Sequence, residues 1–314
     1  MKTLLASCFS LLLTVGLFAQ EAAPTVVPPS EDPQLENSLL WKISGNDLAK
    51  PSYLYGTIHI IDKDDFFLTD GTKQAIKEAE LVTFEINLEE ATGIGAQLGM
   101  MMQAFMKGGQ TLKDLLSEED YRMVDAHFTK MGLPLWVLER IKPMFLSVIA
   151  GMDMSQMGGG EMVSYEMEIA QRAKTRDLPM AGLETIEYQM SMFDSIPYEA
   201  QAKMLVDAIE MTQDTSAAAV DELEMMTELY LNQNIMGMVQ SIGDDAEGLG
   251  QFEDMLLRNR NRNWIPVMGR QMEDKTVLFA VGAGHLAGKN GVINLLREAG
   301  YTVVPVLDEA VNRP

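Results

Sequence analysis

The chain of 314 residues contains a single cysteine, Cys8. Cys8 lies in an N-terminal segment that we expect to be removed, so the remaining chain has no thiol. It therefore cannot form a disulfide, use a thiolate nucleophile or bind zinc through cysteine. Any metal site must be built from His, Asp, Glu or Asn side chains, and the chain has only three histidines, His59, His127 and His285.

Basic residues are also scarce. The 24 Lys and Arg residues stand against 46 Asp and Glu residues, which gives a formal net charge of −22. The sequence shows no stripe of Lys or Arg that would offset this excess. Because such a surface repels phosphate backbones, the composition argues against nucleic-acid binding.

Long apolar runs are missing from most of the chain. The run at residues 4–18 follows Lys2, precedes the small residue Ala19 and is too short to span a bilayer. This pattern predicts a signal peptide over residues 1–20, followed by a disordered tether rich in Pro, Glu and Ser over residues 21–37. We therefore expect an exported protein, periplasmic or secreted, whose mature chain has no transmembrane helix.

Strand-like segments gather near the two ends of the remaining chain, whereas its middle is helical in pattern. The candidate strands are 40–44, 52–55, 81–86, 276–281 and 301–306, with a weaker candidate at 178–182. Gly45-Asn46-Asp47 is a turn signal that predicts a hairpin between the first two. The predicted fold class is α/β, with a mixed central sheet built from N- and C-terminal segments and a large Met-rich helical insertion.

The predicted domain covers residues 38–310. Its α/β core is expected at about 38–90, 176–186 and 274–308, and its helical insertions at about 91–175 and 187–273. Ser117, followed by three acidic residues, predicts a helix start, and Pro197 suits a first helical position. Further helices are expected near 71–79, 134–150, 161–176, 218–233, 250–272 and 290–300.

The chain has 25 methionines, concentrated in the predicted helices. The plain interpretation is flexible filling of a core or a compliant groove. The alternative is a Cu(I) site, since thioethers bind this ion. Its candidate ligands are Met152, Met154, Met157 and Met162.

Two segments near opposite ends of the chain share one local pattern. Residues 53–59 (YLYGTIH) and 278–285 (LFAVGAGH) are apolar, β-favouring runs that reach a Gly and place a His three residues later. A His just past a buried strand lies at the edge of a sheet where open α/β folds bind ligands. We therefore interpret His59 and His285 as halves of one metal or catalytic site, and His127 as a surface or boundary residue.

Glu85 is the third candidate for this site. It interrupts an otherwise apolar strand, and a buried strand rarely carries a carboxylate without a partner. If this strand lies beside the strand of the first Gly-x-x-His motif, Glu85 reaches the same edge as His59. Two His and one carboxylate leave an open coordination position, as in catalytic zinc and related divalent sites. The alternative is an edge strand on which Glu85 faces solvent.

Two more segments carry candidate functional residues. Glu184, in Gly-Leu-Glu-Thr after a short strand, is a candidate ligand, a carboxylate that orients a His, or an acidic helix cap. The run 256–264 (LLRNRNRNW) is a basic cluster in an acidic protein. It is either a solvated helix face or a means of placing an Arg against a substrate carboxylate or oxyanion.

Together these motifs resemble the TraB/GumN family, which includes the Tiki proteases and is distantly related to ChaN-like and erythromycin-esterase-like proteins. The resemblance rests on the Gly-x-x-His pair, Glu85, the Gly-Leu-Glu-Thr segment, Arg260-Asn261 before Trp264, and the closing Gly-x-Gly-His-Leu-x-Gly-x-x-Gly-Val run. It covers roughly residues 38–307.

The resemblance implies an α/β core with helical insertions and a divalent-metal-dependent peptidase. Carried over position by position, the metal ligands are His59, Glu85 and His285, and the catalytic residues are Glu85, Glu184, Arg260 and Asn261. Zinc, manganese and cobalt all suit such ligands. The expected partner is a peptide or protein substrate. The alternatives are a non-catalytic protein that sequesters peptides, as TraB-like members associated with peptide pheromones could, and a metal or haem carrier. The sequence leaves the oligomeric state open.

Overall fold

A computed structural model describes residues 35–150, 162–213, 225–243, 252 and 254–307. The predicted signal peptide and most of the predicted tether lie outside these residues. The strands are β1 (Leu40–Gly45), β2 (Ser52–Thr57), β3 (Ile61–Asp62), β4 (Leu81–Ile86), β5 (Met162–Val163), β6 (Met180–Glu184), β7 (Val277–Gly282) and β8 (Tyr301–Pro305).

The described helices and helical turns lie mostly between β4 and β7, with α2 before β4 and with η3 and α16 after β7. They are α2 (Asp70–Glu78), α3 (Leu88–Ala91), α4 (Ile94–Gln103), α5 (Leu112–Leu115), α6 (Glu118–Lys130), α7 (Leu135–Leu138), α8 (Pro143–Ala150), α10 (Tyr165–Thr175), α11 (Ile186–Phe193), α12 (Tyr198–Gln213), α14 (Ile235–Gly243), the π-helical turn η2 (Asp254–Arg258), α15 (Asn259–Met272), the 3-10 turn η3 (Ala283–His285) and α16 (Val292–Glu298).

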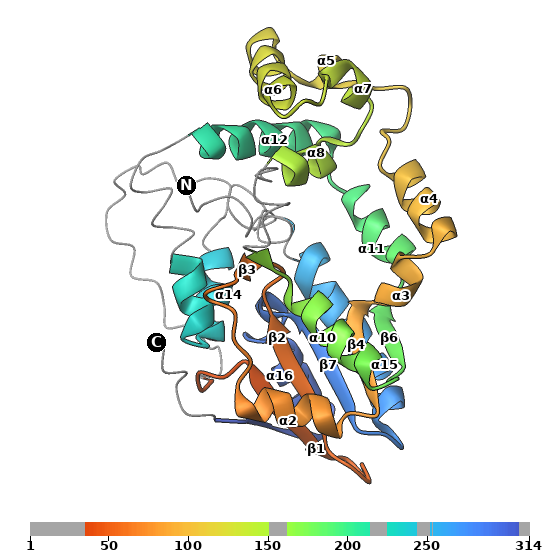
Figure 1. The fold of residues 1–314 in the computed structure, drawn as a ribbon, viewed down its shortest axis with the longest axis vertical. Coiled ribbons are helices and arrows are strands. Elements are labelled where there is room, and N and C mark those ends of the chain that lie inside the picture. The colour runs from red at the N-terminus through yellow and green to blue at the C-terminus, as the bar shows by residue number, and fades with distance from the viewer. Residues whose placement is uncertain (1–34, 151–161, 214–224, 244–251, 253, 308–314) are drawn as a thin grey trace.

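The central sheet is mixed and has the strand order β6-β4-β7-β2-β1-β8. Strands β6, β4, β7 and β2 run parallel, whereas β1 is antiparallel to both β2 and β8. Strands from both ends of the chain therefore lie side by side, which confirms the predicted fold class. Figure 1 shows α2 and α10 in front of this sheet and α15 and α16 behind it.

The first two strands form the predicted hairpin. Leu40 of β1 pairs with Tyr55 of β2. At the turn, Gly45 (the last residue of β1), Asn46 and Asp47 all have positive φ, at 76°, 49° and 61°. Glycine and asparagine tolerate this left-handed region best, so the turn signal had a direct backbone cause.

The middle of the sheet is covered on both faces. Every residue of β2 is buried, and β7 is buried up to its last residue. Parallel strands with helices on both faces read as continuous apolar runs instead of alternating patterns. This explains why the runs before the two Gly-x-x-His motifs lack polar positions.

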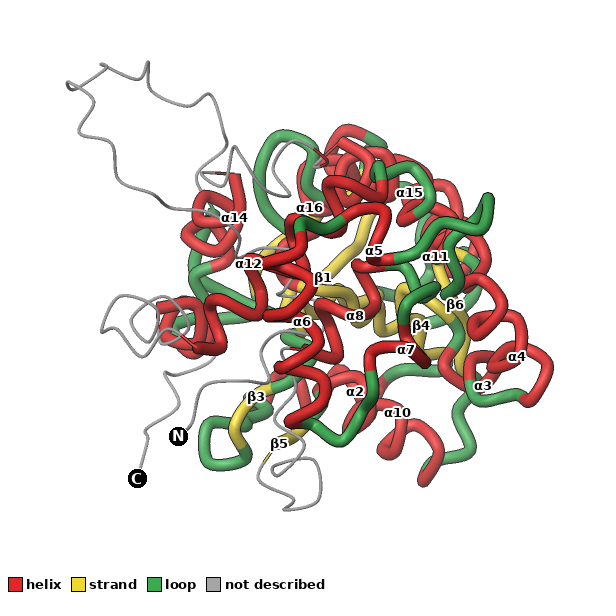
Figure 2. The backbone as a smooth tube through the Cα atoms, turned by 90° about the horizontal axis from the view of Figure 1, so that it is seen from above, coloured by secondary structure: helices red, strands yellow, loops and turns green. Residues whose placement is uncertain are grey.

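A separate helical layer lies beyond the carboxyl ends of the parallel strands (Figure 1). Helices α5 to α8 and α12 contribute to an apolar cluster of their own, which includes Phe128, Leu135, Leu146 and Leu205. Seen from above, α6, α8 and α12 lie across the strands (Figure 2). The helical middle of the sequence therefore packs over the edge of the sheet where the candidate site residues emerge.

Some predicted elements differ from the observed ones. The helix expected near 134–150 is two helices, α7 and α8, separated before Pro143. Proline disfavours the helical conformation in the residue before it, here Lys142, and removes a backbone donor. The short strands β3 and β5, which pair as a second small sheet, had no signal strong enough to predict them.

The structure also bears on His127, on the candidate Cu(I) ligands and on the expected lack of a transmembrane helix. His127 is half-buried, with Nε2 3.0 Å from the carbonyl of Ala150, which fits a boundary residue. Met162 lies in β5, whereas the other three candidate Cu(I) ligands lie outside the described residues. In the part of the chain that the structure describes, no helix is both long and apolar enough to cross a bilayer.

Gly182 in β6 provides a test of the packing beside the site. A Cβ there would lie 2.6 Å from the backbone nitrogen of Asn87 and 2.8 Å from the carbonyl oxygen of Glu184. We expect Gly182→Ala to lower the free energy of unfolding by about 1–3 kcal/mol, because side-chain rotation cannot relieve a clash with backbone atoms. Urea denaturation measures this change.

The matched control is Gly95→Ala in α4, where nothing lies within 4 Å of the added carbon. This control should be neutral or stabilising by up to about 1 kcal/mol, since Ala is the better helix former. Equal effects of the two substitutions would contradict the packing described between β4 and β6.

Candidate active site at the carboxyl edge of the sheet

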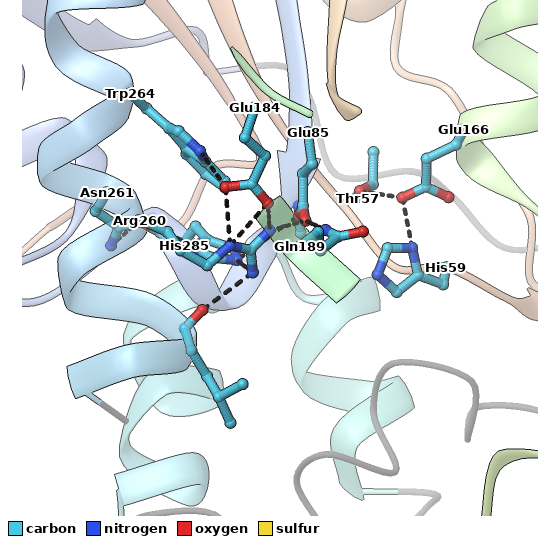
Figure 3. Close-up of polar contacts among 12 residues, drawn as sticks. Thr57, His59, Glu85, Glu166, Glu184, Gln189, Arg260, Asn261, Trp264 and His285 are labelled. Carbon is cyan, nitrogen blue, oxygen red and sulfur yellow. Dashed lines mark hydrogen bonds and ion pairs between the residues drawn. The ribbon is translucent and has the colours of Figure 1, made fainter. Parts of the chain in front are cut away.

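The candidate residues meet where four parallel strands end. Glu85 is the penultimate residue of β4 and Glu184 the last of β6. His59 follows β2 by two residues and His285 follows β7 by three. Carboxyl ends of parallel strands share one edge of a sheet, which is where open α/β folds bind their ligands. Figure 3 shows the four side chains along this edge.

The strand order differs from the arrangement that we considered for Glu85. Strand β4 lies beside β7, and β7 separates it from β2. Glu85 is therefore closest to the second Gly-x-x-His motif, with its Oε1 3.7 Å from Nε2 of His285. Glu85 is only 7% exposed, so the alternative of a solvent-facing carboxylate is wrong.

Gly282 allows this close approach. A Cβ at Gly282 would lie 3.3 Å from Oε1 of Glu85. The backbone N–H of Gly282 donates to the same oxygen at 2.9 Å, and Nε2 of Gln189 on α11 donates to Oε2 at 3.2 Å. The glycine of the second motif thus exposes its backbone to the carboxylate from the neighbouring strand.

Arg260 on α15 is the centre of the cluster and is 2% exposed. Its Nη2 donates to Oε2 of Glu85 at 2.5 Å and to Oε1 of Glu184 at 2.7 Å, and its Nε donates to Oε1 of Glu184 at 3.0 Å. Nη1 donates to the carbonyl of Leu256 at 3.0 Å and lies 3.2 Å from Nε2 of His285. Every N–H of the guanidinium is thus directed at a protein acceptor.

Trp264, one helical turn after Arg260, supports the same cluster. The guanidinium carbon lies 4.9 Å from the centre of the Trp264 ring, within cation–π range. The indole N–H donates to Oε2 of Glu184 at 3.0 Å. Glu184 therefore orients Arg260. The N-cap of α11 is not Glu184 but Thr185, whose side chain accepts from the backbone N–H of Tyr188.

Asn261 holds the ring of His285 in one orientation. The Nδ2 group of Asn261 donates to the carbonyls of His285, at 3.3 Å, and Asn290, at 2.9 Å. Its Oδ1 must therefore face Nδ1 of His285, 2.6 Å away, and accept a hydrogen bond from it. This network assigns the proton to Nδ1 and leaves a lone pair on Nε2, which faces Arg260 and Glu85.

Burial and neighbouring charges shift the pKa values of His285, Glu85 and Glu184 in different directions. Burial, only partly opposed by Glu85, lowers the pKa of His285 to about 3. Burial by itself would raise the pKa of Glu85, but the charge of Arg260 and the two imidazoles hold it well below the usual range. Burial outweighs Arg260 at the second carboxylate and raises the pKa of Glu184. At neutral pH the cluster contains a neutral His285 beside an ionised Glu85.

His59 has a different carboxylate partner. Its Nδ1 lies 2.8 Å from Oε1 of Glu166, the second residue of α10. The hydroxyl of Thr57 donates to the same oxygen at 2.6 Å. Although burial lowers the pKa of His59, the charge of Glu166 and its hydrogen bond raise it above the ordinary value.

The predicted metal ligands do not form a coordinating group in this structure. Across the described residues, no group of three or more His, Cys, Asp or Glu side chains has the geometry of a metal site. The donor chemistry nevertheless fits a divalent cation. Nδ1 of His285 and Nδ1 of His59 each lie within hydrogen-bond distance of an oxygen acceptor, the outer contact that is typical of metal-ligating histidines. Metal binding by His59, Glu85 and His285 stays a prediction.

The structure brings together five of the six predicted site residues directly: Glu85, Glu184, Arg260, Asn261 and His285 (Figure 3). His59 lies at the same edge, where its Nδ1 contacts Glu166. Thr57, Glu166 and Gln189 were not predicted as functional residues. No motif pairs Glu166 with His59, and the sequence placed Glu166 only within the helix expected near 161–176.

These observations define a buried ion-pair cluster at the ligand-binding edge of an α/β sheet. A model of the TraB/PrgY/gumN family matches residues 39–305. The chain therefore belongs to this family, as the resemblance predicted.

Curated relatives of the chain are named as metalloproteases. It is similar to Metalloprotease TIKI1 of Danio rerio, with 25% identity over 85% of this chain and 63% of the relative. For Metalloprotease TIKI1 of Homo sapiens the identity is 22%, over 93% of this chain and 67% of the relative. About a third of each relative thus has no counterpart in the match. No solved structure matches the chain.

Replacing Arg260 by Met would leave the two buried carboxylates without their counterion. We expect this substitution to lower the free energy of unfolding by about 3–5 kcal/mol, the range found when one partner of a buried ion pair is removed. Chemical denaturation measures the loss. Arg262→Met, in the same helix, removes an exposed Arg whose Nη2 donates to Asn290, and we expect it to cost less than about 1 kcal/mol. An Arg260 variant as stable as the Arg262 variant would contradict the central role of the guanidinium.

The lowered pKa of His285 predicts a pH dependence of stability in chelator-treated protein. Below the ordinary pKa of 6.5 the unfolded chain binds a proton at this residue, whereas the folded site binds it only near pH 3. The free energy of unfolding should therefore decrease as the pH is lowered through this window. His285 contributes at most about 1.4 kcal/mol per pH unit to this decrease.

The measurement is urea unfolding between about pH 7 and about pH 5, above the range in which ordinary carboxylates titrate. The raised pKa of Glu184 adds a contribution in both proteins that are compared. His285→Gln should show a shallower slope than the unsubstituted protein. The pKa of the half-buried His127 is also lowered, but its contribution is the same in both proteins and cancels. Parallel slopes would show that His285 is not held neutral by the fold.

Proposed function

We propose that the protein is an exported, divalent-metal-dependent hydrolase that cleaves peptides. The observation that carries the proposal is the buried cluster in which Glu85, Arg260 and His285 meet at the carboxyl edge of the sheet. The similarity to proteins named as metalloproteases supports the reaction class. Export rests on the N-terminal pattern of the sequence.

The proposed cation ligands are His59, Glu85 and His285. They are the imidazole nitrogens and carboxylate oxygens that zinc, manganese and cobalt accept. A divalent cation held there would supply Lewis acidity for the attack of water on a peptide carbonyl.

The protein's own groups prepare the site for this chemistry. Asn261 keeps the proton of His285 on Nδ1, so that Nε2 carries the lone pair that would bind the cation in place of its 3.2 Å contact with Nη1 of Arg260. Arg260 keeps Glu85 ionised and in place. In this proposal Arg260 and Glu184 are positioning residues, because the guanidinium N–H groups already point at protein acceptors. Glu85 is the carboxylate closest to His285. We assign to it the role of cation ligand or of general base.

Two other functions are separable by experiment. A protein that sequesters peptides would bind them with or without a metal and would not cleave them. A metal or haem carrier would bind its cargo without turning over a peptide.

The proposal predicts that metal content and peptide cleavage are lost together. We expect His59→Ala combined with His285→Ala to remove the bound cation and to slow hydrolysis by at least about 100-fold, since removal of a catalytic metal costs several kcal/mol of transition-state stabilisation. Elemental analysis and mass spectrometry of a library of unstructured peptides provide the two readouts.

His127→Gln is the matched control, because His127 lies in α6 and contacts the carbonyl of Ala150. This variant should keep both metal and activity. Chelation of the unsubstituted protein should abolish cleavage, and added Zn²⁺, Mn²⁺ or Co²⁺ should restore it. Equal metal content in the double variant and the unsubstituted protein would overturn the proposed site.

A further inference from the structure

Glu166 is a largely buried acid that the sequence motifs did not single out. Its side chain is 14% exposed and that of His59 25% exposed. A single oxygen of Glu166, Oε1, lies 2.8 Å from Nδ1 of His59 and accepts from the hydroxyl of Thr57 at 2.6 Å. Oε2 accepts from the hydroxyl of Ser164, the N-cap of α10, at 3.2 Å. Figure 3 shows Glu166 above the His59 ring, with Thr57 beside it.

The small second sheet sets this contact. Strand β3 begins two residues after His59, and β5 ends just before the cap of α10. The two strands are antiparallel, and Ile61 pairs with Val163. This pairing brings the start of α10, which follows β5, back beside the residues that precede β3. From there one carboxylate oxygen of Glu166 reaches both Thr57 and His59.

The neighbouring Tyr165 fixes the first turn of α10. Its ring is fully buried and lies 4.7 Å from the centroid of Phe66 and 5.3 Å from that of Tyr230. Its hydroxyl donates to the carbonyl of Phe67 at 3.0 Å and accepts from the backbone N–H of Phe67 at 3.2 Å. Glu166 therefore starts from a backbone position that is held by packing and by two hydrogen bonds.

The contact has a consequence for the imidazole. An ionised carboxylate can only accept a hydrogen bond, so Nδ1 of a neutral His59 must carry the proton and Nε2 the lone pair. Asn261 holds His285 in the same way through Nδ1. Two unrelated acceptors, one on α10 and one on α15, thus select the same tautomer in the two Gly-x-x-His histidines.

We propose that Glu166 is a positioning residue that fixes the tautomer and orientation of His59 at the carboxyl edge of the sheet. In this inference the tautomer serves to offer Nε2 to a divalent cation, and that purpose rests on the proposed function. The tautomer itself is a property of the metal-free protein, so it can be tested even if the protein binds no metal.

Nitrogen-15 NMR of the imidazoles provides the first test. The chain has only three histidines, so His127→Gln and His285→Gln variants assign the signals. In protein that has been treated with a chelator and brought to alkaline pH, where the rings are neutral, His59 should carry its proton on Nδ1. A His59 that carries the proton on Nε2 in the unsubstituted protein would overturn the proposal, whatever the variants do.

Two substitutions at Glu166 separate geometry from charge. Glu166→Gln keeps an accepting oxygen for both Thr57 and His59, so it should retain the Nδ1-protonated tautomer and lose less than about tenfold in Co²⁺ affinity. Glu166→Leu removes the acceptor, so His59 should shift toward the Nε2-protonated form, with Co²⁺ binding weakened by about 10–100-fold, as for other outer contacts of metal-ligating histidines. Visible absorption of bound Co²⁺ measures the affinity.

Glu168→Gln is the matched control, since Glu168 lies on the same helix and its side chain is 3.7 Å from Arg172. It should leave the tautomer and Co²⁺ binding unchanged. A folded Glu166→Leu variant with the His59 spectrum of the unsubstituted protein would overturn the inference. If the unsubstituted protein shows the Nδ1-protonated tautomer but binds no Co²⁺, the proposed function fails while the positioning role of Glu166 stands.

Discussion

The candidate site depends on one guanidinium that is shared by two buried carboxylates. Glu85 and Glu184 end neighbouring parallel strands, and each would be costly to bury as an isolated charge. Arg260 offsets this cost because it donates to both and reaches His285 and a main-chain carbonyl as well. The ion pairs therefore connect β4 and β6 with α15, and the contact between Arg260 and His285 connects the turn after β7 with the same helix.

Close backbone approach makes this arrangement possible. Gly282 lets the Glu85 carboxylate reach its main-chain N–H, and a Cβ at Gly56 would lie 3.0 Å from Leu286 and 3.2 Å from the backbone of Ala283. The two glycines of the repeated motif thus have different neighbours, a carboxylate in one case and the turn that carries His285 in the other. The motif is repeated in sequence, but its halves play unlike structural parts.

Much of the fold was predictable because local signals and long-range packing agree. The apolar runs before His59 and His285 predict buried strands, and the turn at Gly45–Asp47 predicts the hairpin. The convergence of Glu85, Glu184, Arg260 and Asn261 followed from the family resemblance. The neighbour of Glu85 was not predictable, since strand order depends on which strands pair across long stretches of chain. Glu166 was missed for a related reason, because β3 and β5 are too short to leave a pattern in the sequence.

The amino-acid sequence by itself determined which chemical groups are available: without cysteine outside the expected leader and with three histidines, a polar site has to rely on imidazole, carboxylate, amide and guanidinium groups. It also determined the buried strands, through the length and continuity of their apolar runs. Only the tertiary structure decided the partners, placing β7 between β2 and β4, Arg260 between two acids and Glu166 against His59. These contacts join residues far apart in the chain, and their distances depend on packing that no local pattern specifies.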